Sequence, residues 1–350
     1  GTAVFDSCMQ AYYSRFKFAH VDAGDLRQVF ETTSGKSLPS FTQLDSTGPI
    51  QPDTRKKLKP VFVLDFSMQQ KHRTLGIGPL PGYNKYDGFM LGAFVHNYQL
   101  PLPRFRFFLA PLYGTKSGSL AGIGNLSYAI YPAGKIHTIE LGIDAARFTG
   151  YETNIDAQKI KLAYNKLAPY LKLTAKEENP LSKRERYAAY KSFFFTEDEF
   201  DKKAVPRNLQ QLKLYYADHR ILYPYEIDAT IDITRDITRI GVTGAYYFNY
   251  AGNKGGLQVR FFAGKLFYNG DKTLVNTLDN DRYLLNLTGA NGYEDYTYSN
   301  YFIGRNEFSG WMSQQIMMRD GGFKVRTDLN SNKVGKTDNW LTAINLNTTI

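Results

Sequence analysis

The sequence has few of the residues that hold small secreted domains and metal centres together. It has one cysteine, Cys8, so an internal disulfide and a cysteine-based zinc site are both excluded. We interpret Cys8 as a small buried residue on a helix. The sequence also has no run of about 18 or more apolar residues, which excludes a transmembrane helix. Insertion into a membrane would have to use strands, because only helices and closed barrels satisfy their backbone hydrogen bonds in lipid.

Acidic residues are outnumbered by basic ones, and the formal net charge is +10. A nucleic-acid-binding protein would gather such an excess on one face. Here the basic runs 55–57, 183–186 and 202–203 lie far apart, are mixed with acids and fall between apolar segments. We interpret them as solvated strand ends and loops, close to lipid phosphates if the chain enters a membrane, and expect no nucleic-acid partner.

The motifs of several catalytic centres are also missing. The sequence has no His-Glu-x-x-His, which would place two imidazoles around one zinc, no Gly-x-Ser-x-Gly elbow and no Walker loop. Gly122-Ile123-Gly124 lies within strand alternation, and we interpret it as tight packing. Residues 197–201 and 279–281 are acidic but lack EF-hand spacing, so we interpret both as solvated loops, with a weak Ca²⁺ site as the alternative. We therefore assign no catalytic, cofactor-binding or metal-ligating residue in this chain.

The first 45 residues have the periodicity of helices. Two helices of the expected length cannot bury their apolar faces alone, so residues 1–45 are predicted to be the end of a larger helical domain. A second helix is predicted to begin at Asp22, with Asp25 three residues later in a capping-box position, and to end at a left-handed Gly35. In the first helix, apolar residues recur at spacings of three and four: Val4, Phe5, Cys8, Met9, Tyr12 and Tyr13.

The pattern changes after residues 46–58, which carry Pro, Gly and charge without periodicity and are predicted to be a linker. From residue 59 to 350, apolar and polar residues alternate with a period of two. In residues 227–234, for example, Ile and Ala occupy one face and Asp and Thr the other. Further strands are predicted at 60–68, 86–99, 104–112, 125–130, 138–143, 158–174, 186–196, 211–216, 236–250, 256–268, 311–319, 322–329 and 338–348.

About a dozen strands of roughly ten residues each, joined mainly by hairpins, are typical of a transmembrane barrel. We therefore predict a mainly β fold, with an antiparallel outer-membrane-type β-barrel in residues 59–350. A soluble sandwich or propeller is the alternative, although its strands are usually nearer five or six residues. An interfacial aromatic girdle is predicted from Tyr98, Tyr113, Tyr131, Tyr151, Tyr250 and Tyr268.

Both ends of the sequence suggest that it is a piece of a longer protein. It starts at Gly1, without an initiator Met or the signal peptide that an outer-membrane protein needs, so we expect residues before Gly1. It ends on the polar run Asn347–Ile350, whereas a closing barrel strand commonly finishes on an aromatic residue. We therefore expect one or more further strands after Ile350.

The amino-terminal tail has an aromatic-rich stretch at residues 12–20, a helix start at Asp25-Leu26 and a Ser-Gly-Lys-Ser-Leu cap at residues 34–38, ending near Phe41. In these motifs it resembles the end of the catalytic region in aminopeptidase N-like zinc metallopeptidases. The chain departs from the family pattern at Val21-Asp22, where a Pro-containing turn is usual, and at Leu26, where Phe is usual. Residues 86–92 and 100–105 are similar to the barrel extension found on such peptidases in Bacteroidetes-type bacteria.

The resemblance implies that this chain is the outer-membrane barrel anchor and carboxy-terminal part of a zinc aminopeptidase. The zinc, the catalytic His-Glu-x-x-His region and the peptide substrate would then belong to residues before Gly1, and the partner of this segment would be outer-membrane lipid. The alternatives are a pore or transport protein without peptidase activity and a soluble β-rich binding domain.

Overall fold

The computed structural model describes residues 2–39, 41, 57–63, 72–155, 158–179, 181–199, 203–253, 255–270, 282–289, 295–299, 319–323 and 335–349. The chain divides into two compact units, Gly1–Thr54 and Arg55–Ile350. Of the predicted linker, residues 46–56 lie outside the described residues.

The first unit contains the two predicted helices, α1 (Thr2–Phe16) and α2 (Ala23–Ser34). The predicted capping box at the start of α2 is confirmed, because the Asp25 backbone N–H donates to the Asp22 carboxylate and the Asp22 N–H donates to the Asp25 carboxylate. Gly35 ends the helix with φ 67°, the left-handed conformation that glycine adopts without strain.

Packing between the two helices is limited. Cys8 of α1 and Val29 of α2 are buried, which confirms the interpretation of the cysteine. Phe5 and Phe30 meet edge to face with their ring centroids 5.8 Å apart. Other apolar residues of the predicted α1 face, such as Tyr13, stay exposed in the described part. No helix among the described residues is long and apolar enough to cross a membrane.

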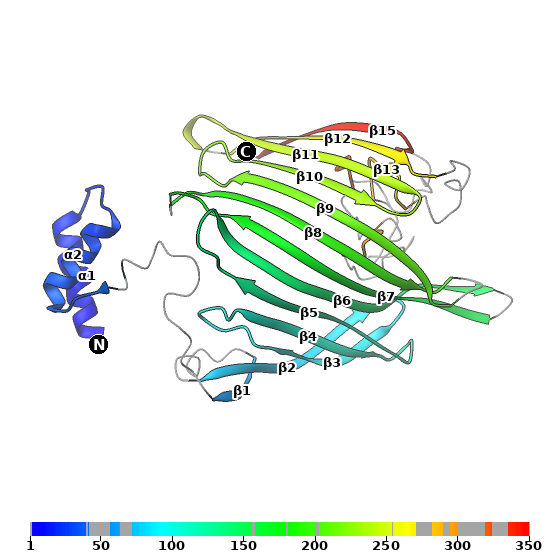
Figure 1. Ribbon diagram of the computed structural model, residues 1–350, viewed down its shortest axis with the longest axis horizontal. Coiled ribbons are helices and arrows are strands. Elements are labelled where there is room, and N and C mark those ends of the chain that lie inside the picture. Colours follow the sequence, from blue (N-terminus) through cyan, green and yellow to red (C-terminus); the bar gives the residue numbers. More distant parts are fainter. Residues whose placement is uncertain are drawn as a thin grey trace. The chain divides into compact units, whose positions relative to one another are not determined.

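The second unit is built on one sheet of 13 strands, which confirms the mainly β, antiparallel prediction. The strands follow one another in sequence order around the sheet (Figure 1), and only the first pair, β1 with β2, is parallel. The strands are β1 Leu58–Phe62, β2 Arg73–Asn84, β3 Gly88–His96, β4 Phe105–Gly114, β5 Ser119–Ile130, β6 Ile136–Ile155, β7 Gln158–Ala175, β8 Arg184–Glu197, β9 Val205–Asp218, β10 Tyr225–Ile233, β11 Ile237–Asn249, β12 Gly256–Tyr268 and β15 Trp340–Thr349.

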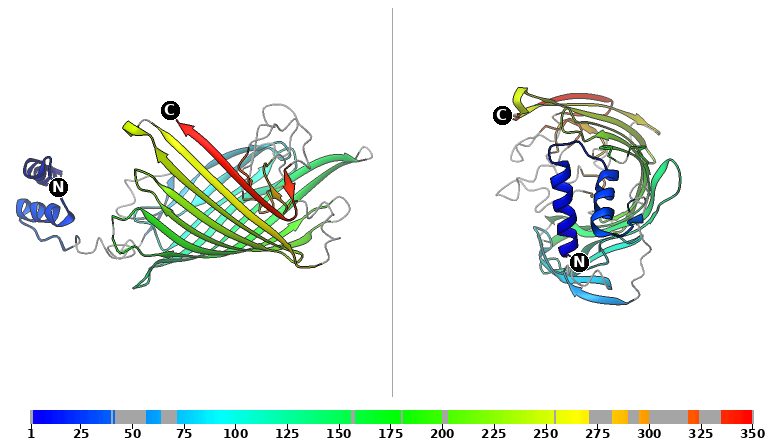
Figure 2. Two further views of the ribbon diagram at one scale, coloured as in Figure 1. Left: turned by 90° about the horizontal axis from the view of Figure 1, so that it is seen from above. Right: turned by 90° about the vertical axis from the view of Figure 1, so that its left-hand side faces the viewer.

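The sheet curls, so that it has a concave inner face and a convex outer face (Figure 2). The short strands β13 (Leu285–Asn286) and β14 (Lys336–Thr337) pair with each other, and Leu285 packs against Phe262 and Ala343 of the inner face. β1 and β15 are the two ends of the sheet, and no pairing joins them within the described residues.

One strand of the 13-stranded sheet, β2, was not predicted from the sequence, and neither were the two-residue strands β13 and β14. β2 has the sequence RTLGIGPLPGYN, in which glycine and proline interrupt the alternation. It forms nevertheless because it pairs with β3 over nine residue pairs, from Gly76↔His96 to Asn84↔Gly88. Of the predicted strand at 311–319, residues 311–318 lie outside the described residues, as does most of the predicted strand at 322–329.

Close packing explains the Gly-x-Gly motif of β5, as predicted. A Cβ atom on Gly122 would lie 2.4 Å from the carbonyl oxygen of Ala110 on the neighbouring strand β4. The φ of Gly122 is 146°, which other residues rarely adopt. The motif therefore serves strand packing.

The outer and inner faces of the sheet differ in polarity. On β10, Ile227 is 47% exposed, whereas Asp232 is only 2% exposed. On β5, Tyr128 is exposed while Ser127 is buried. The alternation predicted from the sequence is therefore present, with the apolar side outward and the polar side inward. Large apolar side chains exposed on the outer face include Leu91, Leu109, Leu141, Leu167, Phe194, Leu214, Val242, Phe261 and Ile344.

The tyrosines predicted to form an aromatic girdle differ in their exposure. Tyr113 and Tyr250 are exposed at strand ends. Tyr268, in contrast, packs against a buried cluster and donates a hydrogen bond to Asp338, so its assignment to the girdle is wrong. Strand alternation turns its side chain to the inner face. A different row of aromatic rings in successive contact runs across neighbouring strands: Tyr216, Tyr225, Tyr246 and Phe248.

Candidate functional site

Segments of the chain between β12 and β15 lie against the inner face of the sheet. A buried apolar cluster joins Phe193 and Leu209 of the sheet to Tyr283. Tyr298 stacks on Tyr164 of β7 with the ring centroids 3.7 Å apart. Lys166, also on β7, donates to the Tyr298 carbonyl at 2.6 Å. The inner face is therefore covered in part by the chain itself.

Glu197 at the end of β8 fixes the first of these segments. Arg207 Nη2 lies 2.7 Å from its carboxylate, and Arg282 Nη1 lies 3.0 Å from both carboxylate oxygens. Arg207 also donates to the Tyr283 hydroxyl at 2.7 Å and lies 3.9 Å above the Phe195 ring. Charge-assisted hydrogen bonds are the stronger kind, so this group joins the sheet firmly to residues 282–283.

A second charged group joins β10 and β11 to residues 296 and 320. Arg239 Nη1 lies 3.3 Å from Asp232, and Arg239 Nη2 donates to Asp320. The Tyr296 hydroxyl donates to Asp232 at 2.7 Å, and the Asn286 backbone N–H donates to Asp320 at 2.8 Å. One buried arginine is thus held between two carboxylates.

The ionisation of the inner segments follows from these neighbours. Burial alone would raise the pKa of the Asp320 carboxyl, but the charges of Arg239 and Arg319 outweigh it and lower that pKa. Burial raises the pKa of the Tyr296 and Tyr298 hydroxyls well above their ordinary value. At neutral pH, Asp320 is therefore ionised and the two tyrosines are neutral hydrogen-bond donors.

A third polar group belongs to the sheet alone. Arg106 lies 2.7 Å from Glu140, which also accepts a hydrogen bond from Tyr170 at 2.8 Å. Next to it, Asp144 accepts hydrogen bonds from Lys191 and from Asn125. These side chains come from five neighbouring strands, β4 to β8, which make this part of the inner wall polar.

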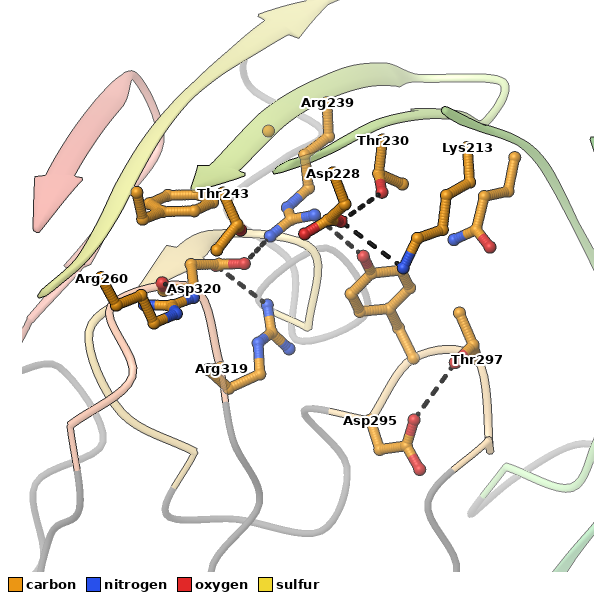
Figure 3. Close-up of a pocket in the computed structure, with 14 residues that line it drawn as sticks. Lys213, Asp228, Thr230, Arg239, Thr243, Arg260, Asp295, Thr297, Arg319 and Asp320 are labelled. Atoms are coloured by element: carbon orange, nitrogen blue, oxygen red, sulfur yellow. Dashed lines mark hydrogen bonds and ion pairs between the residues drawn. The ribbon is translucent and has the colours of Figure 1, made fainter. Parts of the chain in front are cut away.

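A cavity of about 480 Å³ lies between the inner face and these segments. Figure 3 shows Arg239, Arg260 and Arg319 around Asp320, and its dashed lines join Asp228 to Lys213 and to Thr230. Lys213 lies 3.5 Å from Asp228. The volume is within the range of small-molecule sites, about 300–1,000 Å³. The cavity is therefore our candidate functional site.

The sequence did not single out this site, because acids and bases that face inward look the same in sequence as those that face water. Glu197 was interpreted as part of a solvated loop, and this is wrong, since its side chain is only 12% exposed and pairs with Arg207 and Arg282. Its neighbour Asp198 instead accepts from the backbone N–H groups of Ala163 and Ala204.

The described part of the chain holds no group of three or more His, Cys, Asp or Glu side chains suited to a metal ion. The acidic run 279–281 lies outside the described residues. The described charged clusters can hold segments together through ion pairs, and they can offer hydrogen-bond donors to a polar ligand.

Comparison with family models, with curated proteins and with solved structures finds no match for this chain. The fold and the site define only a class, a curled antiparallel sheet with an apolar outer face and a charged inner face that carries segments of its own chain. This is a β-rich fold compatible with an outer-membrane barrel, and any statement of function rests on its geometry.

Proposed function

We propose that residues 55–350 are a membrane-embedded domain of the outer-membrane barrel type, which anchors whatever precedes it in the chain. The observation that carries the proposal is the inverted polarity of the sheet. A domain folded in water buries the apolar side of an amphipathic strand. Here Leu214 and Ile227 point outward, and Asp232 and Arg239 point inward.

The free energy involved is large. Burying a Leu, Ile or Phe side chain contributes about 1.5–3 kcal/mol. The outer face leaves at least ten such side chains about half exposed, which in water forgoes on the order of 10 kcal/mol. Contact with hydrocarbon would recover this free energy, and the polar inner face would stay away from the lipid.

Strand length also supports a membrane crossing. A tilted transmembrane strand needs about 9–11 residues. β3 and β10 have 9 residues each, and β4 and β15 have 10. The hairpin of β6 and β7 is longer, with 20 and 18 residues, so part of it would stand outside the lipid.

The role of an anchor is supported by the occupied inner face. The ion pairs of Glu197 and Arg239 hold parts of residues 282–320 against the sheet. An inner face that is covered in part by its own chain suits an anchor better than an open pore. The second candidate, a pore or transport protein, is favoured only by the cavity of about 480 Å³ on that face.

The anchored partner is a further proposal, supported by the resemblance of residues 12–41 to the end of the catalytic region in aminopeptidase N-like zinc peptidases. The described residues offer no ligand set that fits zinc. The resemblance implies that the metal and the peptide chemistry would belong to the catalytic region of such a peptidase, outside this segment. The isolated chain is expected to show no zinc-dependent cleavage of amino-acid anilides, and turnover with stoichiometric zinc would contradict this assignment.

The membrane proposal is tested by flotation. The purified chain, refolded from detergent into phospholipid vesicles, should float with them on a density gradient and resist extraction at alkaline pH. A chain that stays folded and monomeric in buffer without detergent, and sediments apart from the vesicles, would contradict the proposal. Planar-bilayer recording separates the two candidates, because an anchor with a filled interior gives no discrete current steps and a pore does.

A further inference from the structure

Three arginines converge on the cavity at its Asp320 side (Figure 3). They come from β11, from β12 and from the segment 319–323. Arg239 donates to the Asp320 carboxylate, and Arg319 Nη2 lies 3.6 Å from it. Arg260 reaches only the backbone carbonyl oxygen of Asp320, at 3.0 Å. The carboxylate is therefore shared by two of the three guanidinium groups.

Arg260 has only neutral acceptors among the described residues. Besides the Asp320 carbonyl, it donates to the side-chain oxygen of Asn345 at 3.0 Å. Its guanidinium group is closely surrounded, because a Cβ atom on Gly322 would lie 2.7 Å from its Nη1. Gly322 has φ 69°, a conformation that suits glycine. A fixed positive charge therefore lines the cavity, and no carboxylate of the described residues pairs with it.

Arg239 also has hydrogen-bonding capacity to offer, through its Nε–H group. Its side chain is 7% exposed, and its Nε has no hydrogen-bond partner within the described part of the chain. A buried N–H without an acceptor is unfavourable, because the group has lost its water and gained nothing in return. Both arginines line the same cavity, so an acceptor placed there could contact each of them.

The other residues of the lining limit which ligand could carry such an acceptor. Asp228 is paired with Lys213, and Asp295 is held by the hydroxyl of Thr297 and the backbone N–H of Ser299. These two carboxylates belong to the lining and would repel a second anionic group. The lining therefore favours a small solute with its negative charge at one end.

We propose that this cavity binds a small solute through one oxyanion group, a carboxylate or a phosphate. Arg260 supplies the charge and two-pronged hydrogen bonding, and Arg239 supplies an additional N–H. The hydroxyls of Thr230 and Thr243 line the same space and offer hydrogen bonds to the rest of the solute. The inference goes beyond the proposed function, since it concerns the inner face and holds whether or not the outer face meets lipid.

The test is a thermal-shift titration of the full chain in detergent with sodium acetate, glycine, inorganic phosphate or sodium chloride at constant ionic strength. A ligand that binds only the folded chain raises the unfolding midpoint in a saturable way. Acetate and glycine report a carboxylate site, and phosphate reports a phosphate site. Chloride is the control for ionic strength alone.

Arg260→Gln should raise the concentration needed for half the shift about tenfold or more, since it removes a charge-assisted pair of bonds. Arg260→Lys keeps the charge and should lose less. The matched control is Arg147→Gln, because Arg147 also has only neutral partners among the described residues, Leu120 O and Asn165 Oδ1, and does not line the cavity. Its titration should equal that of the unaltered chain.

Two results would overturn the proposal. One is a midpoint that follows ionic strength alone with every anion. The other is a saturable shift that Arg260→Gln leaves unchanged. If Arg260→Gln fails to fold, as judged by circular dichroism, Thr243→Val, which removes only a lining hydroxyl, takes its place and should weaken the shift several-fold. An unchanged titration of Thr243→Val would then overturn the proposal as well.

Discussion

The outer and inner faces of the sheet are made by the same strands, yet they are held in opposite ways. Outward positions such as Leu214 and Val242 are apolar and exposed, and their side chains have no polar groups that need a hydrogen-bond partner. Inward positions such as Asp232 and Arg239 are charged and buried, and each pairs with a group of opposite charge. The comparison teaches that side chains of the inner face are held by specific ion pairs and hydrogen bonds, whereas those of the outer face need only an apolar environment.

The largest expected effect on stability comes from removing one member of an ion pair on the inner face. Arg239→Met would leave Asp232 and Asp320 buried without their shared cation, and removing one member of a buried ion pair costs about 3–5 kcal/mol. Denaturant unfolding in detergent should show this loss, and residues near 296 and 320 should become sensitive to protease.

Arg147→Met is the control, because Arg147 is exposed and has only neutral partners in the described part. Its cost should stay below about 1 kcal/mol. Equal costs for the two variants would contradict the view that the inner pairs fix the segments.

The next effect compares adjacent positions on the two faces of β11. Val242→Arg places a charge outward, where it would cost about 2–4 kcal/mol near the middle of a bilayer. Thr243→Arg places the same charge inward, beside the cavity, whose lining includes three aspartates. We expect the first variant to lower the folded fraction in vesicles much more than the second, as measured by flotation. Equal losses would remove the evidence for lipid at the outer face.

The smallest effect is expected from acid. Because Asp320 has a lowered pKa in the folded chain, its contribution to stability is fully present above the unfolded value of 3.8 and is lost as the pH falls through the lower folded value. Protease sensitivity near residue 320 should therefore be unchanged from pH 8 to about pH 5 and rise only below about pH 4. Asp320→Asn should remove this step, whereas a step that survives in Asp320→Asn must come from another carboxyl group.

Much of the local structure could be read from the sequence. The helix start at Asp22 and its end at Gly35 were predictable because capping depends on neighbours within four residues. The amphipathic strand at 227–234 was predictable because its alternation is unbroken. β2 was missed because glycine and proline hide its alternation, and only pairing with β3 reveals it.

The candidate site was not predictable by the same route. Arg239, Arg260 and Asp320 are separated by many residues, and no motif joins them. Glu197 looked like one acid in a solvated run, and only the fold brings Arg207 and Arg282 to it. A signal did exist in retrospect, since charged residues on the polar side of long apolar strands need partners wherever that side is buried.

The sequence by itself determined the two helices, the change to a period of two and the segregation of apolar from polar side chains, because each depends on residues close together along the chain. The tertiary structure alone decided that the polar side faces inward, which segments cover it and which charges pair there. Those outcomes depend on contacts between strands and segments far apart in sequence, and no local pattern encodes such contacts.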